Sequence, residues 1–377
     1  MSNNYFVVID YGSFEIRLKI YDDKNKEIFA TSTKEFLNEN IFENSDLLNI
    51  LIRKAEKKIS SHIENVLVLY DDKDTYCVDL SIKKKFFENI DINKYLANIL
   101  EEAQSLVYSN YKDTVILHSI NQMIIVDGKE YNRSEIIDIS GKDIILSYKF
   151  LCLSKKKYQA IEDIFVNNNL NIVNIYSSSF IKSINYKEVF NKNDLTVCLD
   201  VGWEKSTLIC YDKEYLKFFG NIKLGGNHFT KDISKLLKIN LLTAEKIKTA
   251  FKSSTFDTET NHLQAEKQNF IKKIVVARMS EIFHLSFKDL FFLKRPSISN
   301  INLFLTGNGS KVFSHLINEI DTDFKFSIIK GYDKPLIDEC ITAKILYFEN
   351  KNDNLNSFEK MNKKKGFFEN FFNFFNN

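Results

Sequence analysis

The sequence predicts an α/β protein built from two similar halves with a ligand cleft between them. Two observations predict this fold. A buried strand ends in Asp10-Tyr11-Gly12-Ser13 and is followed by an alternating strand, and the same arrangement recurs at Asp200-Val201-Gly202. The glycine lets backbone N–H groups approach a phosphate, and the acid can hold a metal-bound water beside it. A repeated hairpin of this kind predicts one phosphate loop in each half.

Length and composition are those of a globular chain of two or more domains. The 377 residues carry 52 basic and 50 acidic side chains, and the net charge of +2 gives no signal for nucleic acid binding. The five cysteines form no CxxC pair, and Cys152, Cys198 and Cys210 lie in apolar strands, as expected of reduced core residues in a cytosolic protein. The six histidines form no metal-binding pattern. We expect no signal peptide before Tyr5 and no stretch that spans a bilayer.

The first half begins with strands at 5–10 and 16–20, a helix capped by Ser45 or Asp46, and a strand at 66–70. Near Asp79 the pattern changes, which indicates an inserted subdomain. Its expected elements are a long amphipathic helix at 92–106, strands at 115–120, 123–126 and 145–153, and a helix at 155–166. A strand at 170–175 returns to the first sheet.

The second half begins with a strand hairpin of the same form as that of the first half. Its expected elements are strands at 197–199, 207–211 and 215–219, a helix from Asn227 to Leu237, a helix around 244–248, a long helix at 264–293, a strand at 301–305 and a closing helix at 343–347. The strand at 301–305 runs into the glycine loop Thr306-Gly307-Asn308-Gly309, which lets the backbone lie against a flat ligand.

Three motifs in this half resemble the bacterial cell division protein family FtsA, a branch of the actin, Hsp70 and sugar-kinase superfamily. They are Leu224-Gly225-Gly226-Asn227-His228-Phe229-Thr230-Lys231-Asp232-Ile233 followed by Ala244-Glu245-Lys246-Ile247-Lys248, then Ala277-Arg278-Met279-Ser280-Glu281-Ile282, then the loop at 306–310. The resemblance covers about residues 5 to 348 and implies a duplicated actin-like fold with a nucleotide cleft. The implied subdomains are 1A (1–80 and 163–195), the inserted FtsA-type 1C (81–162), 2A (196–230 and 301–348) and 2B (231–300).

The resemblance also implies that ATP and Mg²⁺ bind in the cleft, with Asp10 and Asp200 around the metal through water. The implied nucleotide-binding residues are Asp10, Gly12, Ser13, Asp200, Gly202, Gly226, Asn227, Glu245, Lys248, Gly307, Asn308 and Gly309. The family usually has Asp-x-Gly-Gly-Gly-Thr-Thr in the second loop, whereas Trp203 and Glu204 follow Gly202 here, and Phe14 follows Ser13 in the first loop. Because side chains there hinder backbone approach to phosphate, we expect very slow or no ATP hydrolysis and assign no catalytic residue.

The C-terminal part differs from the rest of the chain. Residues 349–365 are polar and predict a flexible linker that ends in Lys363-Lys364-Lys365. In residues 366–377, a helical arc of roughly 160° holds all the phenylalanines, namely Phe367, Phe368, Phe371, Phe372, Phe374 and Phe375. This pattern predicts an amphipathic helix that lies on an anionic membrane surface beside the lysines. Proteins of the FtsA family end in such a helix.

The resemblance implies a function at the division site. The protein would tether the ring of the tubulin-like protein FtsZ to the cytoplasmic face of the cell inner membrane at midcell, self-associate into actin-like filaments and contact other division proteins. Arg278 resembles the arginine implicated in binding the FtsZ C-terminal tail, although an internal ion pair is the alternative. Two other readings stay open, a pilus-assembly or shape-determining actin homologue and a small-molecule kinase.

Overall fold

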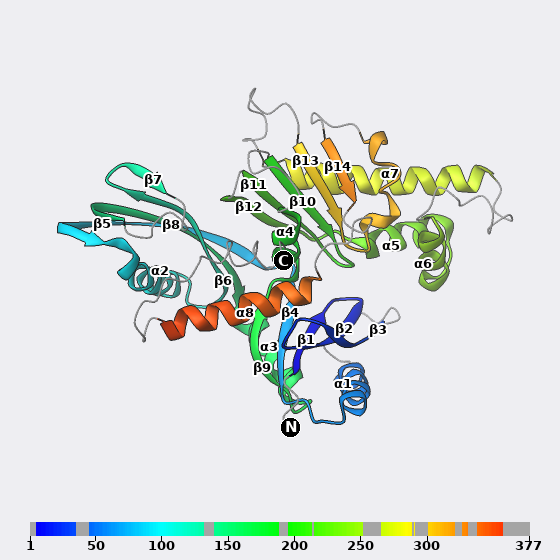
Figure 1. Ribbon diagram of the computed structural model, residues 1–377. Helices are drawn as coiled ribbons and strands as arrows, with labels where there is room; N and C mark the ends of the chain where they lie inside the picture. Colours follow the sequence, from blue (N-terminus) through cyan, green and yellow to red (C-terminus); the bar gives the residue numbers. More distant parts are fainter. Residues whose placement is uncertain are drawn as a thin grey trace.

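The computed structural model describes residues 5–34, 45–131, 139–187, 195–212, 215–251, 265–288, 290, 301–320, 326–330 and 338–356. Two five-stranded sheets form the centres of the two halves (Figure 1). The first sheet has the order β3 (Glu27–Lys34), β2 (Glu15–Asp22), β1 (Tyr5–Tyr11), β4 (Asn65–Tyr70) and β9 (Asn171–Tyr176). The second sheet has the order β12 (Tyr215–Ile222), β11 (Ser206–Asp212), β10 (Leu195–Val201), β13 (Ile301–Thr306) and β14 (Phe326–Lys330).

The two sheets share one topology. In each, the first three strands pair antiparallel and the last two are added in parallel. In the central strand of each sheet, β1 or β10, the hairpin aspartate is the second-last residue of the strand. This equivalence confirms the duplicated fold predicted from the two Asp-x-Gly hairpins.

Helices cover both faces of the first sheet. They are α1 (Ser45–Ile59), α3 (Lys155–Val166), α4 (Ser178–Lys187) and α8 (Glu339–Asn356). The apolar faces of α1 and α3 pack on one face of the sheet. The opposite face packs against α4 and α8, where the buried Ile181 and Ala343 belong to one cluster with Leu67 and Leu69. Parallel strands are usually buried on both faces, and helices on both sides of this sheet cover its parallel strands β1, β4 and β9.

The second half carries α5 (Gly226–Leu237), α6 (Leu241–Ala250) and α7 (Ala265–Phe287), with short 3₁₀ turns at Ser310–Val312 and Ile317–Glu319. Phe229 and Ile233 of α5 and Ile271 and Val275 of α7 are buried in one core with the second sheet. Asn240 caps α6 by accepting a 2.8 Å hydrogen bond from the backbone N–H of Thr243. In Figure 1 the long helix α7 crosses behind the second sheet while α5 and α6 lie at its side.

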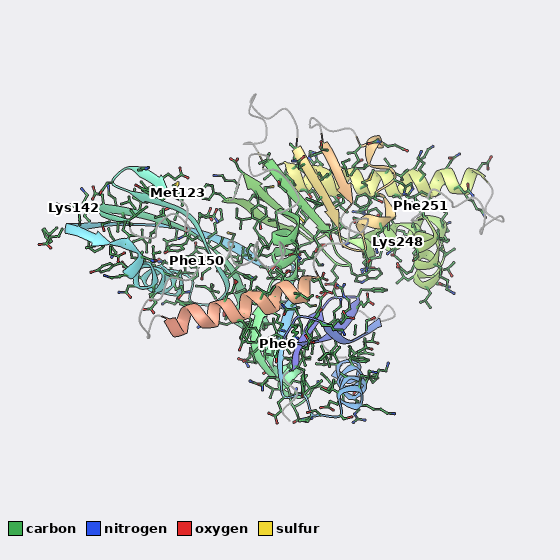
Figure 2. All side chains as sticks on the ribbon, in the orientation of Figure 1. Phe6, Met123, Lys142, Phe150, Lys248 and Phe251 are labelled. Carbon is green, nitrogen blue, oxygen red and sulfur yellow. The ribbon has the colours of Figure 1, made fainter. Side chains whose placement is uncertain are left out.

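The inserted subdomain contains a third sheet, with the order β5 (Tyr76–Asp91), β8 (Ser140–Ser154), β6 (Thr114–Val126) and β7 (Lys129–Tyr131). The helix α2 (Leu96–Asn110), preceded by a 3₁₀ turn at Ile92–Lys94, packs Ile99, Ala103 and Val107 on this sheet. Figure 2 shows Phe150 within this unit. The sheet begins at Tyr76, and α3 packs on the first sheet, so the described insert spans a slightly different stretch from the expected 81–162.

A further apolar cluster connects the parts of the molecule. Phe180 of α4, which follows the first sheet, is buried against Cys198, Ile209 and Phe304 of the second sheet. Leu151 of β8 belongs to the same cluster. The interface between the halves is therefore a packed apolar core beneath the two aspartate hairpins.

The end of the chain extends the closing helix. The helix α8 continues to Asn356 and so includes the first eight residues of the stretch expected as linker, 349–365. Residues 357–377, with the three lysines and six phenylalanines of the predicted membrane segment, lie outside the described residues. Among the described residues, no helix combines the length and hydrophobicity needed to cross a membrane.

Candidate functional site

The first aspartate hairpin brings Asp10 against an arginine. Asp10 and Arg17 are cross-strand partners in the β1–β2 register. The guanidinium of Arg17 lies 2.5 Å from Asp10 Oδ2 and 3.5 Å from Glu339 Oε1 of α8. The pKa of Arg17 is raised, chiefly because Asp10 favours the charged guanidinium. The buried carboxylate that was predicted to face a metal therefore has a cation from its own hairpin beside it.

The second hairpin places Asp200 beside a lysine from the other half. The Nζ of Lys182, on α4, lies 3.5 Å from Asp200 Oδ2, and the hydroxyl of Ser179 donates to the same oxygen at 3.0 Å. Burial disfavours the charge of Lys182, but Asp200, Glu339 and Asp10 together outweigh burial, so the pKa of Lys182 is raised. This ammonium group connects the two halves through their predicted metal-facing carboxylates.

The N-terminus of α5 packs directly against the second hairpin. The backbone N–H of Gly226 donates to Gly202 O at 2.8 Å, and that of Asn227 donates to Trp203 O at 2.8 Å. The N–H of His228 donates to Gly225 O at 3.0 Å, and the N–H of Gly225 donates to His228 Nδ1 at 3.1 Å. These are the amides that a helix N-terminus offers to an anion. In this protein they already donate to partners in the same chain.

The predicted adenosine side is assembled from three segments. Gly226 lies against the loop of Gly309, because a Cβ on Gly226 would come 3.4 Å from Gly309 Cα. Gly307 has φ +80°, and a Cβ there would come 2.3 Å from Val201 O, so only glycine fits. Gly309 donates its N–H to Val201 O at 2.9 Å. The loop predicted from Thr306 to Gly309 thus packs on the end of β10, and Asn308 is exposed.

Glu245 and Lys248 of α6 form a small ion-pair network on this side. Lys248 is buried, and its Nζ lies 2.6 Å from Glu245 Oε2 and donates to Gly226 O at 3.0 Å. The hydroxyl of Thr230 donates to the same Glu245 oxygen at 2.6 Å. Figure 2 shows Lys248 on the α5–α6 side of the second half. The two residues lie on α6 and contact the N-terminal part of α5, and their contact with a nucleotide stays a prediction.

Aromatic side chains from both hairpins meet between the halves. The rings of Phe14 and Trp203 have centroids 4.4 Å apart and planes inclined by 30°. The ammonium of Lys248 lies 4.4 Å from the centroid of the Trp203 ring, within cation–π range. Glu204, the next residue, is exposed, whereas Lys205 turns inward and donates to Thr207 at 2.7 Å. We call Phe14, Trp203 and Lys248 the aromatic clasp.

The phosphate side of this arrangement does not fit a metal-bound triphosphate. A Mg²⁺ ion prefers carboxylate and water oxygens and adds two positive charges. Here Arg17 and Lys182 already supply one positive charge each beside Asp10 and Asp200. The large ring of Trp203 follows Gly202 at a position where close backbone approach to phosphate needs a small residue. The predicted glycines and acids are thus present, while their surroundings differ from a phosphate site.

Sequence reasoning missed the two cations beside the hairpin aspartates, Arg17 and Lys182. Arg17 could have been found from the hairpin alone, because residues 12–15 separate the paired Tyr11 and Ile16, and this register places Arg17 opposite Asp10. Lys182 could not, since it lies on a helix outside both hairpins. Gly12 and Ser13 lie in the first turn, where a Cβ on Gly12 would come 2.7 Å from Glu15 O.

Arg278 forms an internal ion pair. Its Nε and a terminal nitrogen donate to the two carboxylate oxygens of Asp232 at 2.7 and 2.9 Å, and Glu281 lies beside it. The Arg278 side chain is 19% exposed. The helix face that was predicted to receive an acidic tail therefore presents an arginine that is already paired with α5.

The two sheets with one topology define an actin-like fold. A solved PilM-PilN type IV pilus biogenesis complex is similar over 88% of this chain and 91% of that chain, with a TM-score of 0.59 at 13% identity. That likeness concerns the fold, since so low an identity carries no function.

Residues 197–357 match the family model of cell division protein FtsA, which confirms the resemblance for the second half and α8. Two curated FtsA proteins of Helicobacter pylori are similar as well. The protein of strain J99 / ATCC 700824 is 23% identical over 146 residues, which make up 39% of this chain and 29% of the relative. The protein of strain ATCC 700392 / 26695 is 23% identical over 145 residues, or 38% of this chain and 29% of the relative. The matched segment thus spans less than a third of these relatives' length.

Proposed function

We propose that this protein is an actin-like cell division protein that attaches the FtsZ ring to the membrane. The observation that carries the proposal is the FtsA match at 197–357, which includes the second sheet and helices α5 to α8. The duplicated sheets and the inserted subdomain support the same reading. The phenylalanine-rich end of the sequence, at 366–377, adds an independent reason to place the protein at a membrane surface.

The partner surface in this proposal is the outer helical region of the second half. Leu236 of α5, Leu242 of α6 and Phe270 of α7 are exposed there, and Arg278 provides a planar cation for a carboxylate. Because Asp232 already holds Arg278, an acidic FtsZ tail has to compete with this internal partner. The proposal therefore assigns a moderate affinity to the single contact, and polymer formation would add to it.

Enzymatic turnover is not part of the proposal. A tether needs a rigid body, a partner site and an anchor, and none of these requires hydrolysis. The ATP and Mg²⁺ predicted from the sequence stay predictions for this chain.

The test is a flotation experiment with three components. Purified full-length protein, FtsZ polymers and anionic vesicles are mixed and centrifuged through a density gradient. We expect FtsZ to float only when the protein is present, and to stay at the bottom with a variant that lacks residues 366–377. The truncated variant should still pellet with FtsZ polymers. If FtsZ does not bind the intact protein in solution or on vesicles, the division-ring function is wrong.

A pilus-assembly role is the second candidate. The likeness to the PilM-PilN complex concerns the fold and does not decide between the two candidates. The two candidates differ in partner, so pull-down from the native cell separates them. Recovery of FtsZ supports the first, and recovery of pilus membrane proteins without FtsZ supports the second.

A further inference from the structure

Several contacts of the candidate site hold the two halves to each other directly. Ser179 and Lys182 of α4 bond Asp200 across the interface, and the hydroxyl of Ser179 is also 3.2 Å from that of Thr207. The amide of Asn221 on β12 donates to Thr75 O at 2.8 Å. The Phe14–Trp203 pair adds an aromatic contact between the two hairpins. If these contacts between the halves were absent, a bound nucleotide would have to connect the two halves by contacting both of them.

Each charged group of the candidate site has an oppositely charged side chain of the same chain beside it. Asp10 has Arg17 at 2.5 Å, Asp200 has Lys182 at 3.5 Å, and Lys248 has Glu245 at 2.6 Å. Buried carboxylates without a cation would repel each other and would need a metal. Here Arg17 and Lys182 lie beside the two hairpin carboxylates, and Glu339 near Arg17 adds a third negative charge.

The backbone N–H groups at the start of α5 already donate hydrogen bonds within the protein. The first three N–H groups of α5 each donate to a backbone carbonyl, and two of those carbonyls belong to the second hairpin. A phosphate group would have to break these bonds and displace the Trp203 ring. Both steps cost free energy that the polyphosphate would repay only with new donors.

We propose that the aromatic clasp and the Arg17–Asp10 and Lys182–Asp200 pairs hold the two halves closed in place of a metal-bound nucleotide. The protein is then closed without ATP, and its assembly does not follow an ATP cycle. This inference is independent of the tethering function, because a nucleotide-independent body can serve any of the roles considered above.

The first arm of the test uses Trp203, the single tryptophan of the chain, as a reporter inside the clasp. Full-length protein is titrated with millimolar ADP, ATP and ATP–Mg²⁺, and tryptophan emission and the melting temperature Tm are recorded. We expect neither to change. A ligand well above its Kd that binds the folded state would raise Tm by about 2 °C or more. A saturable change in emission together with such a rise in Tm overturns the proposal.

The second arm asks whether the clasp closes the halves. Hydrogen exchange is followed by NMR at the side-chain amide of Asn221, which donates to Thr75 O across the interface, in the protein without nucleotide. We expect slow exchange in the wild type, and exchange at least tenfold faster in Trp203→Ala and in Phe14→Leu. Phe14→Leu is the milder change, and it keeps the tryptophan reporter if Trp203→Ala fails to fold.

The matched control is Phe86→Ala. Phe86 pairs with Tyr95 at 5.3 Å within the inserted subdomain and is partly buried like Phe14. It should lower Tm without changing exchange at the Asn221 side-chain amide. If Trp203→Ala and Phe14→Leu leave this exchange as it is in the wild type, the clasp does not close the cleft. Binding of FtsZ and vesicles by the wild-type protein is scored separately, so failure of this inference is distinguishable from failure of the tether.

Discussion

Individual residues show how the chain satisfies its buried charges locally. Asp10 and Arg17 lie opposite each other because Tyr11 pairs with Ile16 at the turn between β1 and β2, so the ion pair follows from hairpin register. His118 of β6 is the opposite case, a buried ring with no carboxylate to hold a proton. It accepts a 2.8 Å hydrogen bond from the backbone N–H of Ser177, which requires the neutral imidazole.

This neutral histidine makes stability depend on pH. Burial lowers the pKa of His118 from 6.5 to about 3, so below pH 6.5 the unfolded chain binds a proton that the folded protein does not. The stability it supports is complete above pH 6.5 and falls by about 1.4 kcal/mol for each pH unit below it. His118→Gln keeps an acceptor for Ser177 and cannot titrate. Urea unfolding at pH 7 and pH 5 should show a smaller loss for the variant, and equal losses would contradict the prediction.

Arg278 gives a second residue-scale prediction. Asp232→Asn removes the charge that holds the guanidinium, so an acidic FtsZ tail peptide should bind about two- to fivefold more tightly. Arg278→Gln should weaken binding. Arg278→Glu is less useful, because it places a third carboxylate beside Asp232 and Glu281 and should lower Tm by itself. The peptide affinity is measured by fluorescence anisotropy, and an unchanged Kd in both Asp232→Asn and Arg278→Gln would remove this pair from the binding site.

Whole elements differ in how well local pattern predicts them. Helix α1 begins at Ser45, one of the two residues expected at its start. Helix α3 begins at Lys155 and ends at Val166, and α5 ends at Leu237, as expected. The strand β5 was missed, although it is 16 residues long. It is an edge strand whose buried Val78 and Ile82 alternate with lysines and other polar residues, and only its pairing with β8 orders it. Such polar edges protect a sheet from pairing with other chains.

The C-terminal segment gives the prediction at the scale of an element. Phe371→Glu with Phe372→Glu places two charges in the predicted apolar arc and should reduce binding to anionic vesicles at least tenfold, because burying a charge at the interface is unfavourable. Asn370→Glu with Asn373→Glu is the matched control, since it adds the same charge on the polar side. Co-sedimentation measures both. Equal loss in the two variants would mean that charge alone, not the phenylalanine face, decides binding.

The molecule as a whole presents a rigid body with one short anchor in this proposal. A helix of twelve residues cannot span a bilayer, which needs about 20, and so it should bind reversibly. Self-association brings several anchors to one surface at high effective concentration. Vesicle binding should therefore rise cooperatively with protein concentration, with a Hill coefficient above one, and should not respond to ATP. A simple hyperbolic isotherm would contradict self-association on the membrane.

The sequence by itself determined the duplicated α/β fold, the two aspartate hairpins, the glycine loops and the helix pair of Glu245 and Lys248. These features depend on strand alternation, turn residues and motifs that lie within about thirty residues of one another, so they can be predicted from the local sequence. Only the tertiary structure decided what surrounds them. Lys182 reaches Asp200 and Phe14 meets Trp203 across the interface between the halves. Such pairs join residues that are far apart in the chain, and whether a predicted ligand site is filled by its own side chains depends on how the two sheets pack.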